Sequence, residues 1–466
     1  MKLKYVIVIV IVAFFCIESV YSQIIPAIQR VSLSENDKTV IDQYISEYAT
    51  FTLDKEELIT NLYSSGEIQF RLIIDEELDW IINLELNDMR APGYKQIYTT
   101  DDGEFDINNS FIVNTFKGMT SDNRVVRFTI DENNFFGVIL YDNYHYIIRY
   151  VNEYTQSRND NSLIVYRSSD IILNDNDFNY INVASEITED LYFQKDNSKK
   201  IKDDFASSNL CKYYLKIATD ADYQYYQAKS SNVGTVNSSI LSILNIVEGV
   251  YESTFNIKFL VTEQFVMTTN VDYTSTSAPT LLQQFQDYWN YHRQGVNRNI
   301  AHLFTGKTLN GGIKGYSNIG VIDNKPMAYG LSMNHTRTPA IVAHEIAHNL
   351  SAGHAFLSDC GCSSINSNDY SIMCDELTTA TNLWFCSQSI GQINSYIATR
   401  INSLEYYTLP VYNSGTSTTI YAPVINVKNT EVKSGAILEL DARSCGGSVK
   451  IDGDFKVESG ATFIIR

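Results

Sequence analysis

The sequence is poor in the residues that mark disordered chains and chains that bind nucleic acids. It has seven prolines beside 32 tyrosines and 22 phenylalanines, a composition that favours a folded, β-rich protein over a disordered one. Basic residues are outnumbered by acidic ones, and the formal net charge is −19. Nucleic acids and anionic membrane surfaces are bound through basic patches, so we expect neither as a partner.

Long apolar runs are also missing after residue 22, so we expect no membrane-spanning helix there. Residues 1–22 have another pattern. They begin with two lysines, continue with an apolar stretch over residues 5–15 that is too short to span a membrane, and end with small residues before Gln23. This pattern predicts a secretory signal peptide, and we therefore expect a secreted, extracellular protein.

Cysteine is absent between residues 24 and 210. Six cysteines follow, and an even number in an exported protein predicts disulfides, although the sequence leaves their pairing open. Four of them have the spacing C-x-C-x11-C-x11-C, which suits a second zinc site poorly. The six are Cys211, Cys360, Cys362, Cys374, Cys386 and Cys445.

Histidine is scarce, with seven in the chain, yet three of them lie in one short segment with the pattern H-E-x-x-H-x5-H. Thr338 as N-cap and Pro339 at the first helical position predict that a helix begins here, and its mostly apolar residues predict burial. His344 and His348 are four residues apart and share one helix face. Glu345 is turned aside and can reach a water at a metal without binding the metal.

A third histidine, His354, follows the helix and can return to the same metal after a sharp turn. Three neutral imidazoles and one open position are what a catalytic zinc needs. The alternative is a buried helix with core histidines, in which each unsatisfied polar group costs roughly 1–3 kcal/mol. We favour the zinc site. The preceding His335 is interpreted as structural.

This segment resembles the zinc signature of the metzincins, H-E-x-x-H-x-x-G-x-x-H, and most closely that of the reprolysin (adamalysin) family. The resemblance implies one catalytic Zn²⁺ held by His344, His348 and His354. It also implies that Glu345 is the general base in the hydrolysis of peptide bonds.

Two further positions bear on the resemblance. Ser-Ile-Met-Cys at residues 371–374 resembles the family's Met-turn, which implies that Met373 forms an apolar floor below the ligands, and Asp375 departs from the tyrosine of astacins and serralysins. Ser351 stands where the family has glycine. Either Ser351 itself takes a positive φ, at roughly 1 kcal/mol of strain, or the turn moves to Gly353. We favour the first, because the spacing of the histidines is the family's own.

The whole pattern predicts a multidomain chain. An α+β, metzincin-like catalytic domain, with a mixed sheet and helices, follows a β-rich pro-domain and precedes a small all-β C-terminal module. The expected boundaries are 1–22 for the signal peptide, 23–208 for the β-rich pro-domain and linker, 209–405 for the zinc protease domain, 406–422 for a linker and 423–466 for the β-repeat module.

The N-terminal part has short β-like runs that predict an antiparallel sheet. Residues 115–149 resemble the reprolysin pro-domain, whose cysteine often silences the zinc. Because this part has no cysteine, a carboxylate or steric cover must replace it if the site is latent. A plain β-domain with a binding role is the alternative. The lysine-rich residues 195–209 are interpreted as a processing site or as a solvated linker. The runs are Ile68–Ile74, Trp80–Leu84, Val125–Ile130, Phe136–Leu140 and Tyr144–Val151.

The catalytic part alternates strands and helices, which predicts a mixed sheet backed by helices. The expected elements are strands at Tyr213–Thr219, Ile257–Val261 and Ala301–Thr305, and helices at residues 237–253, Thr280–Trp289 and Ser387–Ile401. By the family resemblance, residues 313–321 form an edge strand over the cleft that pairs with substrate backbone. Its central residues are Gly315, Tyr316, Ser317, Asn318 and Ile319.

The C-terminal residues contain a short repeat, Val-x-Ser-Gly-Ala, at 432–436 and again at 457–461. This predicts small stacked β-units. It resembles C-terminal modules of exported proteins in Gram-negative bacteria, which implies a surface or sorting partner through residues 423–466. A bare β-cap is the equally weighted alternative.

Together these features predict a secreted zinc endopeptidase, made as a pro-protein, that acts on protein or peptide substrates. The alternative from another class is a non-catalytic secreted binding or adhesion protein on a metzincin-like scaffold. The presence of Glu345 favours the enzyme, because a purely structural zinc needs no base.

Overall fold

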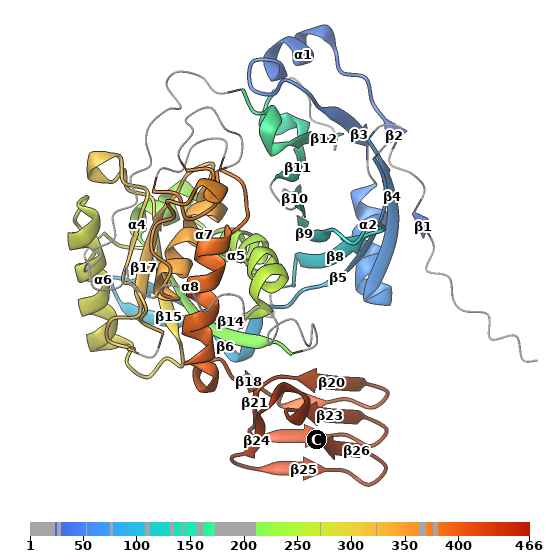
Figure 1. Ribbon diagram of the computed structural model, residues 1–466, viewed down its shortest axis with the longest axis vertical. Coiled ribbons are helices and arrows are strands. Elements are labelled where there is room, and N and C mark those ends of the chain that lie inside the picture. Colours follow the sequence, from blue (N-terminus) through green and yellow to red (C-terminus); the bar gives the residue numbers. More distant parts are fainter. Residues whose placement is uncertain are drawn as a thin grey trace, which may run out of the picture.

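The computed structural model shows three parts, which Figure 1 separates clearly: an N-terminal sheet, a middle part that contains the histidine motif and is called the catalytic part after its predicted role, and a C-terminal stack of strands. It describes residues 24–25, 29–52, 54–74, 78–107, 112–130, 135–141, 144–155, 162–172, 211–270, 272–322, 324–362, 370–375 and 381–466. The expected signal peptide and the lysine-rich connector at 195–209 lie outside these residues, so both stay predictions.

The N-terminal part is built on a ten-stranded sheet with the order β1-β4-β5-β8-β9-β10-β11-β12-β3-β2. In β4 and β5 buried residues alternate with more exposed ones, and Ile68, Phe70 and Leu72 of β4 face the core, whereas β9, β10 and β12 are buried along most of their length. The β-rich N-terminal region is thus confirmed. The strands are β1 Ile24–Ile25, β2 Gln29–Arg30, β3 Ala49–Thr52, β4 Glu67–Ile73, β5 Asp79–Leu86, β8 Thr115–Thr120, β9 Val125–Ile130, β10 Phe135–Leu140, β11 His145–Tyr150 and β12 Ser162–Arg167.

Two helices accompany this sheet. Helix α1, Glu35–Ile41, begins at Ser34, whose side chain accepts a hydrogen bond from the Asp37 N–H. Helix α2, Lys55–Ser65, begins at Asp54 and ends at Gly66 with φ 79°. Leu58 and Leu62 of α2 are buried against the sheet.

The catalytic part has a seven-stranded mixed sheet with the order β16-β17-β15-β13-β14-β6-β7. Helices α5, α7 and α8 share one hydrophobic cluster with the sheet, and α6 lies in a second cluster with residues of the same strands. The mixed α/β architecture is therefore confirmed. The elements are β13 Tyr213–Ala221, α4 Tyr223–Ala228, α5 Val233–Phe255, β14 Ile257–Met267, α6 Ala278–His292, β15 Ile300–Thr305, β16 Gly315–Ser317, β17 Tyr329–Met333, α7 Thr338–Asn349 and α8 Ser387–Ala398.

Short 3-10 helices connect these elements. They are η1 Val151–Glu153, η2 Ser168–Asp170, η4 Asn310–Gly312, η5 Ser358–Cys360, η6 Ile401–Ser403 and η7 Arg443–Cys445.

Two strands of the catalytic sheet come from the N-terminal part. Strand β6, Arg90–Thr100, pairs parallel with β14, and β7, Gly103–Asp106, pairs antiparallel with β6. The expected division near residue 208 stays a prediction about domains, but the sheet itself crosses it. The sequence pattern misses this, because Pro92 and Gly93 interrupt β6 and give no signal for which sheet it joins.

The two parts are also joined along α5 by a buried polar network. Arg127 of β9, which is 3% exposed, forms an ion pair with Glu252 of α5 at 2.7 Å. The Asn87 amide donates to Glu248 at 3.0 Å, and Asn245 donates to main-chain carbonyls of the N-terminal sheet. Removing either part would leave these groups buried without partners or exposed to water.

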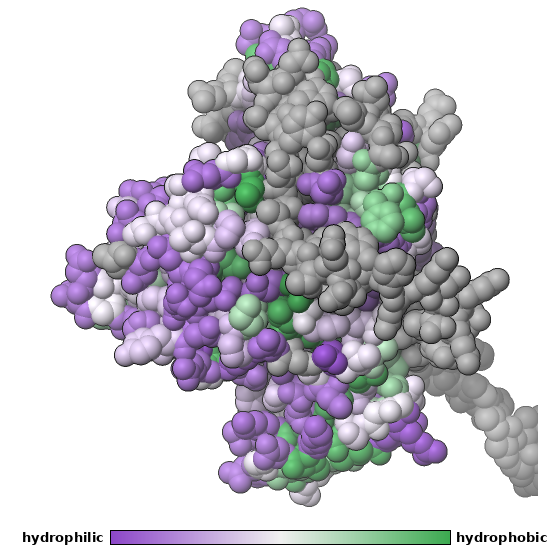
Figure 2. All heavy atoms as spheres, turned by 60° about the vertical axis from the view of Figure 1, so that its left-hand side comes forward, coloured by the Kyte–Doolittle hydropathy of each residue, from purple (hydrophilic) through white to green (hydrophobic). Residues whose placement is uncertain are grey.

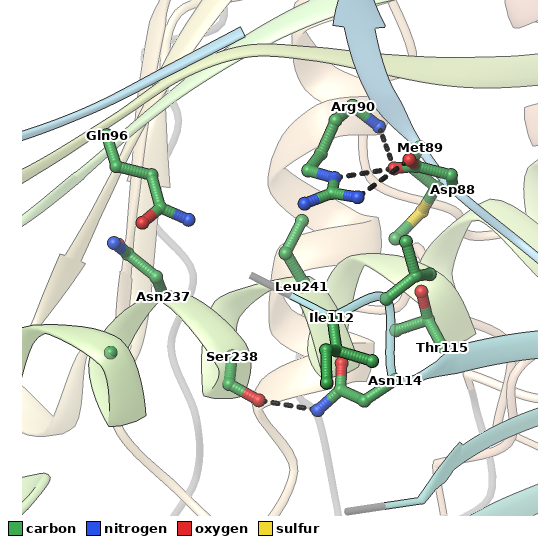
Figure 3. Close-up of a pocket in the computed structure, with 12 residues that line it drawn as sticks. Asp88, Met89, Arg90, Gln96, Ile112, Asn114, Thr115, Asn237, Ser238 and Leu241 are labelled. Carbon is green, nitrogen blue, oxygen red and sulfur yellow. Dashed lines mark hydrogen bonds and ion pairs between the residues drawn. The ribbon is translucent and has the colours of Figure 1, made fainter. Parts of the chain in front are cut away.

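A small cavity of about 80 Å³ lies at the same junction (Figure 3). Figure 3 shows the side-chain amides of Gln96 and Asn237 facing each other across it. Below them, Asn114 donates to the Ser238 hydroxyl at 2.7 Å. The contact between the N-terminal strands and α5 therefore includes polar side chains from both parts.

One helix among the described residues, α5, is long and apolar enough to cross a membrane by length and composition. It is the central helix of the catalytic part, and 61% of its most apolar window is buried inside the protein. Its burial accounts for its composition.

The C-terminal residues form three coils of parallel strands. Residues 406–422, expected as a linker, instead make the first coil, since β18, β19 and β20 pair with the strands of the second. Strands of two residues are too short to give a sequence pattern. The coils are β18 Tyr406–Tyr407, β19 Val411–Tyr412 and β20 Ser417–Tyr421; β21 Val424–Val427, β22 Thr430–Val432 and β23 Ile437–Asp441; and β24 Ser448–Ile451, β25 Phe455–Val457 and β26 Thr462–Ile465.

This stack is fastened to the catalytic part and carries apolar residues on its surface. The Cys211–Cys445 disulfide joins it to the residues just before β13. Figure 2 shows a hydrophobic band low on the molecule, where the stack lies in Figure 1. Ile451 and Ile465 at its last coil are 52% and 47% exposed. A surface or sorting partner for residues 423–466 stays a prediction.

Candidate metal centre and active site

Helix α7 places His344, Glu345 and His348 in the interior. All three are 0% exposed, and the apolar residues around them pack in the catalytic core. The start of the helix corrects one expectation. Thr338 is the first helical residue rather than the N-cap, and its hydroxyl donates to the His335 carbonyl at 2.6 Å. Pro339 lies in the first turn, where it costs no helical hydrogen bond.

The chain turns sharply at Ser351, directly after the helix. Ser351 has φ 73°, and its N–H donates to the His348 carbonyl at 2.8 Å. Gly353 does not have a positive φ. The expectation that Ser351 itself takes the position of the family's glycine is confirmed, and the alternative at Gly353 is not.

The turn brings the third imidazole back to the first two. His344, His348 and His354 can each offer one nitrogen, and these nitrogens lie within 4.8 Å of one another. The ring centroids are 4.6–5.2 Å apart. The Nε2 atoms of all three are buried and make no hydrogen bond to any described residue. Three convergent, buried and unpartnered nitrogens fit a tetrahedral metal ion that keeps one position open.

Main-chain carbonyls fix which ring nitrogen carries the proton. His344 Nδ1 lies 2.7 Å from the Ile372 carbonyl, and His348 Nδ1 lies 2.7 Å from the Ala352 carbonyl. A carbonyl only accepts, so each Nδ1 must carry the hydrogen and each Nε2 keeps its lone pair. These acceptors could not be found from the sequence, because every residue has a carbonyl.

Burial also keeps the rings neutral. It lowers the pKa of His344 well below its usual value and that of His348 to about 3, with the neighbouring imidazoles adding to both shifts. For His354, burial lowers the pKa and Asp375 partly opposes the shift. A neutral imidazole is the form that binds a metal.

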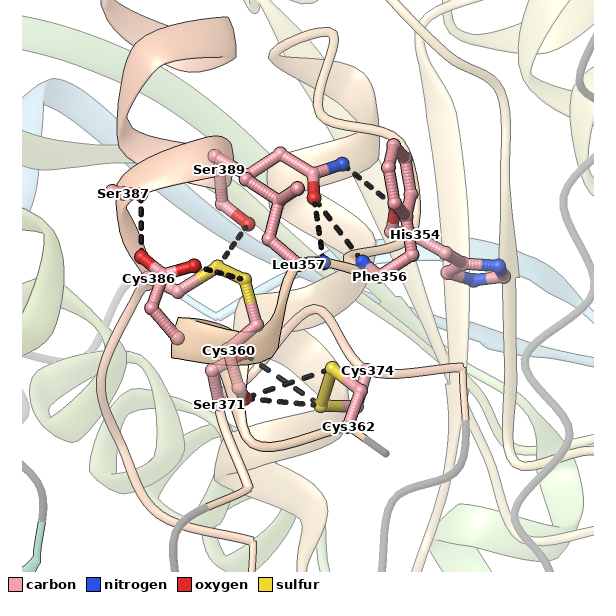
Figure 4. Close-up of a disulfide and its surroundings, with 12 residues drawn as sticks. His354, Phe356, Leu357, Cys360, Cys362, Ser371, Cys374, Cys386, Ser387 and Ser389 are labelled. Atoms are coloured by element: carbon pink, nitrogen blue, oxygen red, sulfur yellow. Dashed lines mark hydrogen bonds between the residues drawn. A yellow bond between two sulfur atoms is a disulfide. The ribbon is translucent and has the colours of Figure 1, made fainter. Parts of the chain in front are cut away.

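The segment around Met373, expected as the Met-turn, is joined to the chain near His354 by a hydrogen bond and to its surroundings by two disulfides. Met373 is 0% exposed, and its carbonyl accepts from the Ala355 N–H at 2.7 Å, which ties the turn to the residue after His354. Figure 4 shows the disulfide Cys360–Cys386 joining this loop to α8, with Cys362–Cys374 beside it. The expected disulfides are thus formed, and the structure pairs Cys211 with Cys445, Cys360 with Cys386 and Cys362 with Cys374.

Helix α8 contacts the main chain around His354 through Gln388. The Gln388 amide donates to the His354 carbonyl at 3.2 Å, and its oxygen accepts from the Phe356 N–H at 3.1 Å. No sequence pattern distinguishes Gln388 as a residue that supports the site.

Glu345 is turned toward the edge strand. One carboxylate oxygen, Oε2, accepts a hydrogen bond from Ser317, while Oε1 has no hydrogen-bond partner in the described part of the chain. Burial raises the pKa of Glu345 well above its usual value, and the Ser317 bond partly opposes the shift. A carboxyl with a raised pKa is suited to take up and release a proton.

The expected edge strand is shorter than residues 313–321. Gly315, Tyr316 and Ser317 form β16, which pairs with β17 on one side and is the outermost strand of the sheet. Asn318 and Ile319 lie beyond the strand, and the Asn318 carbonyl accepts from Asn349 of α7 at 2.8 Å. An outermost strand can pair with an extended peptide, so the expected role of β16 in binding substrate stays a prediction.

Two comparisons relate this chain to known proteins. Residues 212–385 match the family model Reprolysin_5, described as metallo-peptidase family M12. This match supports the resemblance to a metzincin-like metalloprotease of the reprolysin type that the sequence predicts. The crystal structure of metalloproteinase-II from Bacteroides fragilis is similar with a TM-score of 0.44 and 13% identity, over 72% of this chain and 94% of that chain.

Proposed function

We propose that this protein is a secreted, zinc-dependent endopeptidase. The observation that carries the proposal is the set of three buried Nε2 atoms, from His344, His348 and His354, which converge without a hydrogen-bond partner in the described chain. Left empty, such a cluster costs about 1–3 kcal/mol for each unsatisfied group. One zinc ion satisfies all three and suits the all-nitrogen donor set.

Bound zinc supplies a Lewis acid that polarises a peptide carbonyl and makes water a stronger nucleophile. The protein supplies the proton transfers. Glu345 takes a proton from the attacking water through a carboxylate oxygen and gives it to the amine that leaves. Nδ1 of His344 and of His348 each donates to a carbonyl, which leaves Nε2 of both neutral rings to bind the metal.

The substrate chain is placed by strand β16. An extended peptide that pairs with its outer edge adds one strand to the catalytic sheet and lies along the buried glutamate. Gly315 and Ser317 supply the backbone groups for this pairing, because Tyr316 is in register with Lys314 and Asn318, which hydrogen-bond to β17. We thus propose Glu345 as the general base and His344, His348 and His354 as the metal ligands.

We also propose that the enzyme is exported and made with an N-terminal pro-segment. The three disulfides support export, since such bonds are typical of oxidising compartments. The pro-segment resemblance supports latency, and the missing cysteine means that a carboxylate or steric cover takes its place. Complete release of residues 29–172 is opposed by strand β6 and by the buried Arg127–Glu252 pair.

The test compares the full-length protein with its Glu345→Gln variant. We expect about one zinc per chain in both, cleavage of a generic protein substrate by the first, and activity lower by roughly 10²–10⁴-fold in the second. Lys307→Ala is a control that removes a buried charge paired with Asp222 rather than with the histidines, and it should stay active. A chain that binds zinc, cleaves nothing and binds a surface partner instead would favour the adhesion alternative.

A further inference from the structure

Two residues of the edge strand contact the carboxylate of Glu345. The Ser317 hydroxyl donates to Glu345 Oε2 and lies 3.1 Å from the main-chain carbonyl of the same glutamate. Ser317 is 2% exposed and Glu345 is 0% exposed, so water does not compete for this hydrogen bond.

The second contact depends on the absence of a side chain. A Cβ at Gly315 would lie 2.3 Å from Glu345 Oε1, a distance that no real contact allows. Residues 315 and 317 face the same side of a strand, since side chains alternate. The intervening Tyr316 packs in the other hydrophobic cluster. One face of β16 is therefore shaped around the glutamate.

We propose that Ser317 and Gly315 are positioning residues for the general base, an inference that rests on the proposed function. Ser317 fixes Oε2, and Gly315 leaves the room in which Oε1 stays free of protein partners. The same three-residue strand is the outermost one that the structure describes in the catalytic sheet, where the proposed function places the substrate. Strand β16 thus connects the docking of a substrate with the orientation of the base.

The kinetic test uses Ser317→Ala, with Ser317→Thr as the conservative variant that keeps the hydroxyl. We expect kcat to fall roughly 10–100-fold in the alanine variant, with KM and zinc content unchanged, as for other groups that orient a catalytic residue. The threonine variant should recover most of kcat. Ser332→Ala is the matched control, because this buried serine of β17 bonds His302 rather than Glu345 and should keep wild-type kcat.

Two further variants strengthen the kinetic test. Gly315→Ala should lower kcat at least as much as Ser317→Ala, because its methyl group displaces Oε1. In the Glu345→Gln background, Ser317→Ala should cause little additional loss, since the base that it orients is gone.

A second readout needs no activity. In metal-free protein, the urea unfolding midpoints of Ser317→Ala, Glu345→Ala and the double variant should be non-additive, because the two side chains interact. Unchanged kcat in Ser317→Ala together with additive midpoints would overturn the inference. If the zinc-loaded wild type cleaves nothing, the proposed function fails, while the midpoints still decide whether Ser317 holds Glu345.

Discussion

The turn at Ser351 gives the sharpest prediction about how the third histidine reaches the metal. Ser351 has φ 73°, in the left-handed region where a side chain costs roughly 1 kcal/mol. Changing it to glycine removes that strain but frees the unfolded chain by roughly 0.4–1 kcal/mol. We therefore expect Ser351→Gly to shift the free energy of unfolding by less than about 0.5 kcal/mol, with zinc affinity unchanged or slightly tighter.

A β-branched residue at the same position should behave differently. Val is far less tolerant of a positive φ than Ser, so Ser351→Val should destabilise the chain by roughly 1–2 kcal/mol and weaken zinc binding by moving His354. At Gly353 an added Cβ meets only the Gln392 amide at 3.8 Å, so Gly353→Ala should be nearly neutral. Urea unfolding and zinc competition against a chelator measure both quantities. The reasoning is refuted if Gly353→Ala loosens zinc more than Ser351→Val does.

Three other perturbations test the surroundings of the site. Arg127→Ala should lower the free energy of unfolding by roughly 3–5 kcal/mol in urea melts, because it removes the buried cation that pairs with Glu252 at 2.7 Å and with Glu248 at 3.9 Å; unchanged stability would show that the two parts are not held there. Burial raises the pKa of Asp220 to about 7, so its contribution to stability is full below about pH 4 and is lost as the pH rises to 7. Asp220→Asn should flatten that part of the stability–pH profile, and an unaltered slope would contradict the shift. Replacing both Cys362 and Cys374 by serine should lower the free energy of unfolding by roughly 2–4 kcal/mol and weaken zinc binding by loosening the segment around Met373. Lower stability with unchanged zinc affinity would show that this disulfide does not support the metal site.

The sequence predicts the site better than the way the parts join. The spacing of His344, His348 and His354 places ligands on a helix and its turn, because a 3.6-residue period leaves few alternatives. The pattern even anticipates the strain at Ser351. It contains no sign of the carbonyls of Ile372 and Ala352, which orient the rings, because main-chain acceptors have no sequence signature.

The larger errors concern long-range pairing. Strand β6 joins the catalytic sheet although it lies more than a hundred residues before its partner β14, and no local pattern encodes that choice. The first coil of the C-terminal stack has two strands of only two residues, so residues 406–422 look like a linker until the next coil pairs with them. The sequence indicates Ser317 only as backbone of an edge strand, and its contact with Glu345 emerges from the fold.

The central claim is that three histidines hold one catalytic zinc ion. It is tested most directly by measuring zinc content and affinity in the purified full-length protein beside its His354→Ala variant. The account predicts about one zinc per wild-type chain and an affinity lower by orders of magnitude in the variant, since one of three ligands is lost. A wild-type chain without zinc, or a variant that binds zinc as tightly as the wild type, would contradict it.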